Sequence, residues 1–254
     1  MAKGLRISIV GCGGIAQRHK MAYETDSDVE IVSVYDVNES AANSFAADSV
    51  APVAKSLQKL IDAGKLGEPV LLRVIFTGGM SLQGNHHADP KLSGGGCLID
   101  NASHGVDLFC HLIGTPARVT AMCGNAVQKI AVEDIGIMLL STANSKQYGE
   151  ITTSLSTAVG ASRVEWFGTK GTGVVSYWMP DEPELSYRCV DDERSTTVDC
   201  EHHPMRFIAE VQHFIACIRE SVMPNVTAEA GLLVSQTIEA AYRSSREGVQ
   251  VAIS

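Results

Sequence analysis

An aspartate and a histidine four residues apart are the residues of this sequence best suited to acid–base chemistry. Asp100 and His104 lie in a segment predicted to be helical over 98–113, so they share one helix face. Imidazole exchanges protons with hydroxyl and carbonyl groups near neutral pH, and a neighbouring carboxylate raises its affinity for the proton. The spacing equally fits a core histidine hydrogen-bonded to a capping aspartate. Three glycines, Gly94 to Gly96, precede the helix and allow its start to approach another group closely.

A metal site is the alternative use of these residues. Asp107 and His111 continue the same face, and other histidines form adjacent pairs at 86–87 and 202–203. Carboxylate and imidazole ligands suit zinc, so a metal-dependent lyase or hydrolase stays an alternative. The sequence contains neither His-Glu-x-x-His nor the cysteine–histidine spacing of a zinc site. We therefore assign no metal ligand.

A glycine-rich turn near the N-terminus has the spacing of a dinucleotide-binding loop. Gly11-Cys12-Gly13-Gly14-Ile15-Ala16 follows an apolar strand pattern at 7–10 and opens a predicted helix at 15–23. Glycines in this G-x-G-x-x-A pattern permit a tight turn and close approach to a pyrophosphate, which the helix N-terminus attracts. Asp36 ends the next predicted strand about 20 residues on, where a carboxylate accepts hydrogen bonds from a ribose and repels a ribose phosphate. The pattern favours NAD over NADP; the alternative is a plain turn with a surface aspartate.

The elements that must position these residues fall into two dissimilar parts. Residues 1–54 predict an α/β unit, a truncated Rossmann-like βαβα arrangement with helices at 15–23 and 39–47. Residues 55–254 predict an α+β domain with a large, mostly antiparallel open sheet. Its expected strands are 68–77, 117–123, 135–143, 148–157, 163–168, 173–178, 185–190 and 196–200, with a possible last strand at 249–253. Its expected helices are 56–63, 98–113, 206–222 and 228–245, and 78–96 is expected to be a loop.

Composition excludes several classes of function. The chain has 254 residues, 45% hydrophobic and 19% charged, with a formal net charge of −9 and no basic run, which argues against nucleic-acid binding. No apolar stretch is long enough to span a membrane. Seven cysteines without C-x-x-C spacing indicate a reducing compartment, and the first strand begins too early to leave room for a signal peptide. We expect a cytoplasmic protein.

Together these stretches resemble the Gfo/Idh/MocA family of NAD(P)-dependent oxidoreductases. The resemblance rests on 7–16 with Asp36, on Leu60 to Pro69 and on Gly94 to Asp107. The stretches Glu165-Trp-Phe-Gly-Thr-Lys-Gly-Thr172 and Glu239-Ala-Ala-Tyr-Arg-Ser-Ser-Arg-Glu-Gly248 add to it. The resemblance implies a Rossmann domain joined to an open-sheet domain, with a sugar, cyclitol or related polyol as substrate. It further implies that His104 exchanges the proton of the substrate hydroxyl while Asp100 orients His104 or the substrate, and we expect a homo-oligomer formed through the C-terminal sheet.

The sequence departs from the family in its cofactor part. The family's Glu-Lys-Pro motif, whose lysine contacts substrate and cofactor, is absent from the whole chain. Ile7 to Asp48 spans 42 residues, whereas six parallel strands with their crossovers need roughly 120. Two strands leave both edges unpaired and supply one wall of the crevice that binds the cofactor. We therefore expect weak binding of NAD(H) by the isolated protein and self-association that covers these edges; the alternative is a non-catalytic remnant that binds a sugar-like ligand or a protein partner.

Overall fold

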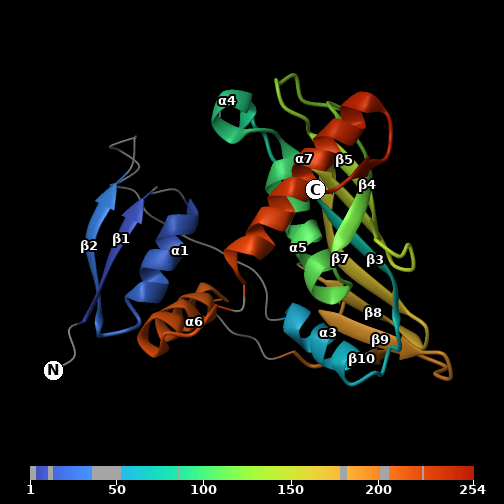
Figure 1. The fold of residues 1–254 in the computed structure, drawn as a ribbon, viewed down its shortest axis with the longest axis horizontal. Helices are drawn as coiled ribbons and strands as arrows, with labels where there is room; N and C mark the ends of the chain where they lie inside the picture. The colour runs from blue at the N-terminus through green and yellow to red at the C-terminus, as the bar shows by residue number, and fades with distance from the viewer. Residues whose placement is uncertain are drawn as a thin grey trace. The chain divides into compact units, whose positions relative to one another are not determined.

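The computed structural model describes residues 4–10, 14–35, 53–84, 86–177, 182–200, 206–224 and 226–254, whose fold is drawn in Figure 1. The chain divides into two compact units. The first, unit 1, comprises residues 1–52 and 201–227; the second, unit 2, comprises 53–200 and 228–254. Residues 201–227 are thus grouped with the N-terminal part, although the sequence placed them in the C-terminal domain. Gly11, Cys12, Gly13, Asp36 and the helix predicted at 39–47 lie outside the described residues.

Unit 1 contains a parallel strand pair with a helix between its strands. Strand β1 (Leu5–Val10) leads into helix α1 (Gly14–Tyr23), which returns to strand β2 (Val29–Tyr35). The two strands pair in parallel from Leu5 opposite Val29 to Val10 opposite Tyr35. Among the described residues this sheet has two strands. The βαβ unit expected around the glycine loop is therefore present.

A helix from much later in the chain completes unit 1. Helix α6 (Arg206–Glu220) packs on α1, burying Val211 and Ile215 against Ala22. At the end of the same helix Arg219 forms an ion pair with Asp26, with Nη1 and Oδ2 2.9 Å apart. These apolar and charged contacts are the reason that α6 belongs to this unit and not to the large sheet.

Unit 2 is built on a nine-stranded, mostly antiparallel sheet. Its strands are β3 (Pro69–Gly79), β4 (Pro116–Gly124), β5 (Ile135–Thr142), β6 (Tyr148–Ser154), β7 (Ser156–Gly168), β8 (Gly171–Ser176), β9 (Leu185–Cys189), β10 (Thr196–Thr197) and β11 (Val251–Ala252). Their order is β10-β9-β8-β7-β3-β6-β5-β4-β11. Among the described strands of this sheet, β3 and β6 form the one parallel pair. The expected sheet is thus confirmed, with the strand predicted at 196–200 shortened to two residues and the predicted last strand formed at 251–252.

One face of this sheet carries the core of unit 2. Buried apolar residues stand directly opposite one another across seven strands: Ala121, Met138, Ile151, Val74, Val164, Val175 and Leu185. Helices α3 (Val53–Asp62), α5 (Ser103–Leu112) and α7 (Ala228–Glu247) contact the sheet, and Figure 1 shows α5 and α7 lying together against it. The buried Trp166 links the layers, because its Nε1 donates to the carbonyl oxygen of Leu112 at 3.1 Å. The alternating sequence pattern thus gives a sheet with one covered face.

Short helical turns interrupt the segment before α5. The region 78–96, expected to be a loop, contains the 3-10 turn η1 (His86–Ala88) and the helix α4 (Pro90–Ser93), whose first turn is capped by the Asp89 side chain. The predicted helix 98–113 begins with a π-helical turn, η2 (Leu98–Ala102), before α5. In the ranges that the structure describes, no helix combines the length and the apolar character needed to cross a membrane.

Candidate functional site

Asp100 and His104 lie on the outer face of the η2–α5 segment. Asp100 is half-buried in η2, and His104 is exposed in the first turn of α5. The opposite face carries the buried residues Leu98, Ala102, Gly105, Val106, Phe109 and Leu112. Asp107 and His111 are also exposed, so the predicted shared face is present. The exposure of His104 excludes the alternative of a core histidine.

The π turn η2 places Asp100 in an irregularly wound segment directly before the helix that carries His104. Such turns are rare and occur frequently at functional sites. The Asp100 N–H donates to the Gly96 carbonyl oxygen at 3.1 Å, and Ser103 Oγ donates to the Asp100 carbonyl oxygen at 2.8 Å. Within the described residues no hydrogen bond joins the side chains of Asp100 and His104. The orienting role of Asp100 therefore stays a prediction.

Glycines bring α5 close to the sheet beneath it. A Cβ atom on Gly105 would lie 2.8 Å from Cγ2 of Ile151, and one on Gly149 would lie 2.7 Å from Cδ2 of Phe109. Both distances are shorter than carbon atoms tolerate without a shift. The helix that carries His104 is thus held directly on strand β6, which gives its outer face a rigid base.

The glycine run before η2 packs against the protein itself. A Cβ on Gly95 would lie 2.0 Å from Oη of Tyr242, and one on Gly96 would lie 1.9 Å from the carbonyl oxygen of Glu133. Gly94 adopts a positive φ of 79° and ends α4. The close approach anticipated for these glycines therefore occurs, and its partners in the structure are Glu133 and Tyr242.

Glu133 is a buried carboxylate that sequence reasoning missed. Its Oε1 accepts hydrogen bonds from the backbone N–H of Gly96 at 2.9 Å, the N–H of Leu98 at 3.0 Å and the hydroxyl of Tyr242 at 2.7 Å. Burial first, and then the Glu133 carboxylate, raise the pKa of Tyr242 above its usual range, so this hydroxyl remains a donor. The available signal was a Glu-Asp pair immediately before a predicted strand.

The adjacent Asp134 fastens a different segment. Its carboxylate accepts the backbone N–H groups of Ala126, Val127 and Gln128 at 2.6–2.9 Å and the Ser156 hydroxyl at 2.7 Å. Burial raises the pKa of Asp134, but these hydrogen bonds outweigh it and hold the pKa at about 2. Asp134 is therefore ionised at neutral pH and secures the turn between β4 and β5.

The described part of the glycine loop has the backbone context that a dinucleotide site requires. Helix α1 starts at Gly14, four residues after β1 ends at Val10, and β2 runs parallel to β1. Ile15 is 57% exposed and Ala16 is half-buried. The strand, helix start and parallel return expected of the motif are thus in place.

The residues considered for a metal site do not gather in the described ranges, where no group of three or more His, Cys, Asp and Glu is arranged to hold a metal ion. His86 and His87 lie in the turn η1 with ring centroids 4.0 Å apart. His202 and His203 lie outside the described residues.

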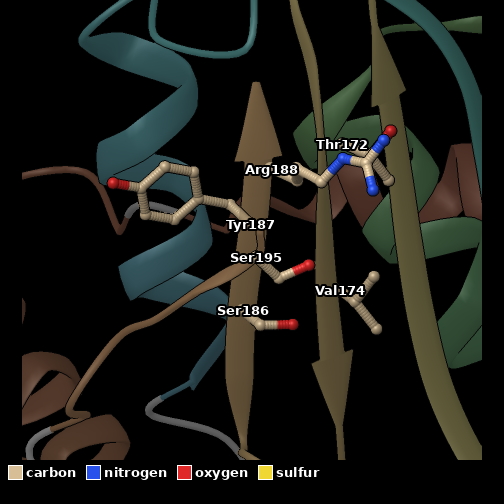
Figure 2. A pocket seen from close by; sticks show the side chains of 6 residues that line it. All are labelled: Thr172, Val174, Ser186, Tyr187, Arg188 and Ser195. Atoms are coloured by element: carbon tan, nitrogen blue, oxygen red, sulfur yellow. The ribbon is translucent and has the colours of Figure 1, made fainter. Parts of the chain in front are cut away.

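A shallow hollow of about 310 Å³ lies on strands β8 and β9, apart from the Asp100 face. It is lined by Thr172, Val174, Ser186, Tyr187, Arg188 and Ser195. Figure 2 shows the Tyr187 ring pointing away from the side on which Thr172 and Val174 lie, and the Tyr187 hydroxyl accepts a hydrogen bond from Lys65. Neither Asp100 nor His104 contributes to this hollow.

Two models of one enzyme family match the chain. Residues 5–87 match the oxidoreductase family's NAD-binding Rossmann fold, and residues 54–174 match the Gfo/Idh/MocA C-terminal domain. The chain belongs to the Gfo/Idh/MocA oxidoreductase family. The family resemblance carried by the glycine loop and the Asp100–His104 segment is therefore confirmed, and so is the NAD-binding character of the N-terminal unit.

Solved structures support the same fold. A putative NADPH-dependent oxidoreductase from Desulfitobacterium hafniense has a TM-score of 0.82 and 17% identity over 98% of each chain. Levoglucosan dehydrogenase, solved with NADH, has a TM-score of 0.78 and 15% identity over 99% of each chain. The glucose-6-phosphate 3-dehydrogenase of Bacillus subtilis is 38% identical over 60 residues, which is 24% of this chain and 17% of that protein. At these identities the solved structures establish the fold, and the sequence match spans less than a fifth of the curated relative.

Proposed function

We propose that this protein is an NAD-dependent dehydrogenase that oxidises or reduces a CH–OH group of a sugar, cyclitol or related polyol. The observation that carries the proposal is the exposed Asp100–His104 face on a segment fastened to a C-terminal domain of this family. Similar proteins named for levoglucosan and for glucose 6-phosphate point to the substrate class.

His104 is the proposed acid–base group. When the alcohol is oxidised, His104 accepts the hydroxyl proton at a ring nitrogen, and in the reverse direction it returns that proton. Asp100 lies one turn earlier on the same face and is proposed to orient His104 or a substrate hydroxyl. Because imidazole can both accept and donate a proton, one histidine serves both directions.

The glycine loop is the proposed cofactor site. Gly11, Cys12, Gly13, Gly14, Ile15 and Ala16 would hold the pyrophosphate, and Asp36 would hold the ribose and disfavour NADP. The start of α1 at Gly14 fits this role, because a helix N-terminus directs N–H groups and a partial positive charge toward an anion. When bound, NAD supplies the hydride acceptor that this chain's side chains lack.

Replacement of His104 tests the proposed activity. We expect His104→Asn to lower kcat about 10²- to 10⁴-fold with polyol substrates, because general acid–base catalysis contributes on that order. His111→Asn is the matched control, since His111 is exposed further along α5; its kcat should stay unchanged. Both melting temperatures should stay near that of the parent protein. Equal activities of the two variants across a panel of sugars and cyclitols would contradict the role of His104.

The second candidate function is non-catalytic binding of a sugar-like ligand. The absent Glu-Lys-Pro motif and the two-stranded sheet of the described part of unit 1 favour it. Ligand-observed NMR with the same panel distinguishes the two functions. Binding that is lost in His104→Asn, with no NADH formed or consumed by the parent protein, would favour the binding role.

Self-association through the C-terminal sheet is part of the proposal. The sheet face opposite the core carries large apolar side chains that are strongly exposed, among them Met122 at 76% and Leu139 at 54%. Exposed apolar patches on a protein surface often mark sites of protein–protein interaction. A second copy of the chain is the proposed partner.

A further inference from the structure

The hydrogen-bonded pair of Glu133, which is buried, and Tyr242, which is half-buried, contacts the segment that carries Asp100. Glu133 is 8% exposed and precedes β5, whereas Tyr242 extends from α7, 109 residues later in the chain. They meet at the start of η2, where the backbone N–H groups of Gly96 and Leu98 both donate to Glu133 Oε1. The N–H of Cys97 donates to the Glu133 carbonyl oxygen at 3.1 Å. Three consecutive backbone donors are thus bound by one residue.

These donors are the ones that a helical start leaves without partners. The first N–H groups of a helical segment have no acceptor within it, and η2 has no side-chain cap of its own at Cys97. A carboxylate at this end also interacts favourably with the backbone dipoles. Glu133 therefore serves as the cap of η2 from outside the segment.

The neighbouring glycines show how closely this contact is fitted. Any side chain at Gly95 would strike the Tyr242 hydroxyl, and any side chain at Gly96 would strike the Glu133 backbone. The Tyr242 hydroxyl donates the third hydrogen bond that Glu133 Oε1 accepts. Rotation of the Glu133 carboxylate would break bonds to two elements at once, so its orientation is constrained by both.

We propose that Glu133 and Tyr242 are positioning residues that set the placement of Asp100 and His104. Neither side chain lies on the outer face of η2–α5; both act through the backbone at 96–98. The expected loss of activity rests on the proposed dehydrogenase function. The expected change in the structure around Asp100 and His104 does not depend on it. Small displacements of catalytic groups lower the rate strongly, because reacting atoms need close alignment.

Tyr242→Phe tests this role with little disturbance of packing. It removes the hydroxyl that bonds Glu133 and keeps the ring. We expect kcat to fall about tenfold with an unchanged KM for NAD, a shift of the His104 imidazole signals in NMR spectra, and faster amide exchange at Gly96 and Leu98. The matched control is Tyr187→Phe, which loses a single hydrogen bond, to Lys65, elsewhere in unit 2. The control should change none of these quantities.

Replacement of Glu133 separates hydrogen bonding from general destabilisation. Glu133→Ala should lower kcat about a hundredfold, and Glu133→Gln, which keeps an acceptor oxygen, should recover most of that loss. The inference would be overturned if Tyr242→Phe kept the kcat, the His104 NMR signals and the amide exchange rates of the parent protein. If the parent protein shows no turnover, the proposed function fails alone: displaced His104 signals and faster exchange would then still support the positioning role, and unchanged ones would overturn it.

Discussion

At the scale of single residues, two adjacent buried carboxylates perform separate tasks. Glu133 fastens the start of the η2–α5 segment, and Asp134 fastens the turn at 125–128. Several hydrogen-bond donors compensate the cost of burying each carboxylate, and a carboxylate tolerates burial when it has such partners. The site therefore depends on hydrogen bonds made well behind the face that Asp100 and His104 present.

Asp134 makes the stability of unit 2 dependent on pH in acid. The pKa of Asp134 in the folded protein is about 2, below its ordinary value of 3.8. Such a group stabilises the fold above about pH 4, and the contribution of about 2 kcal/mol is lost as the pH falls toward 2. We expect Asp134→Asn to lower the free energy of unfolding at pH 7 and to flatten its pH dependence between pH 4 and 2, measured by urea denaturation. The exposed Asp191→Asn should change neither; equal behaviour of both variants would contradict the assignment.

At the scale of elements, helix α6 is the unexpected part of the N-terminal unit. Its apolar face, with Val211 and Ile215, is buried against α1. A two-stranded parallel sheet is a poor independent unit, and α6 adds apolar contacts to it through α1. Unit 1 is thus assembled from two distant stretches of the chain, 1–52 and 201–227.

Shortening a buried side chain of α6 tests this packing. Ile215 is 2% exposed, so Ile215→Ala should cost about 2–5 kcal/mol of local stability in unit 1. Amide exchange in β1 and β2 should accelerate, while that of β5 and β6 should stay the same. Phe214→Ala, whose parent side chain is 47% exposed on the same helix, is the control with a small expected effect. Unchanged exchange in β1 and β2 would show that α6 does not stabilise this sheet.

At the scale of the whole molecule, the described residues contain a large, completed sheet and a small, two-stranded one. The nine-stranded sheet has one face covered by helices and the other bearing exposed apolar side chains. A dinucleotide crevice forms where the strand order of a complete Rossmann sheet reverses, and we expect the small sheet to supply one wall of it. Cofactor affinity and association state are therefore expected to be linked.

This linkage predicts concentration-dependent behaviour. We expect light scattering to show self-association that increases with protein concentration, and calorimetry on the dilute monomer to show NAD binding weaker than micromolar. Met122→Asp would place a charge on the exposed sheet face and should shift the equilibrium toward monomer. Val190→Asp, whose parent side chain is 78% exposed in the turn after β9, is a control for added charge. A concentration-independent monomer with micromolar or tighter affinity would contradict both expectations.

Much of the fold follows from local patterns. Alternation and apolar runs predicted most strands of the large sheet to within a few residues, because a strand with one buried face must alternate. The exception is β7, which begins at Ser156 and not at the predicted residue 163. The spacing of Asp100 and His104 predicted their shared face, since side chains four apart lie together on a helix, whereas the exposure of His104 was decided by the fold. The π turn at the start of that helix was missed, because no residue type in Leu98–Ala102 distinguishes it from an α-helical turn.

The sequence by itself determined most element types, the family and the helix face that Asp100 and His104 share. Tertiary structure decided which distant elements meet: β3 between β6 and β7, α6 on α1, and Tyr242 with Glu133 at the start of η2. The physical reason is that periodicity reports whether a face is buried, whereas the identity of its partner depends on chain segments separated by tens to more than a hundred residues. The glycines at 94–96 illustrate this difference, because their types predicted a close approach and only the fold identified what they approach.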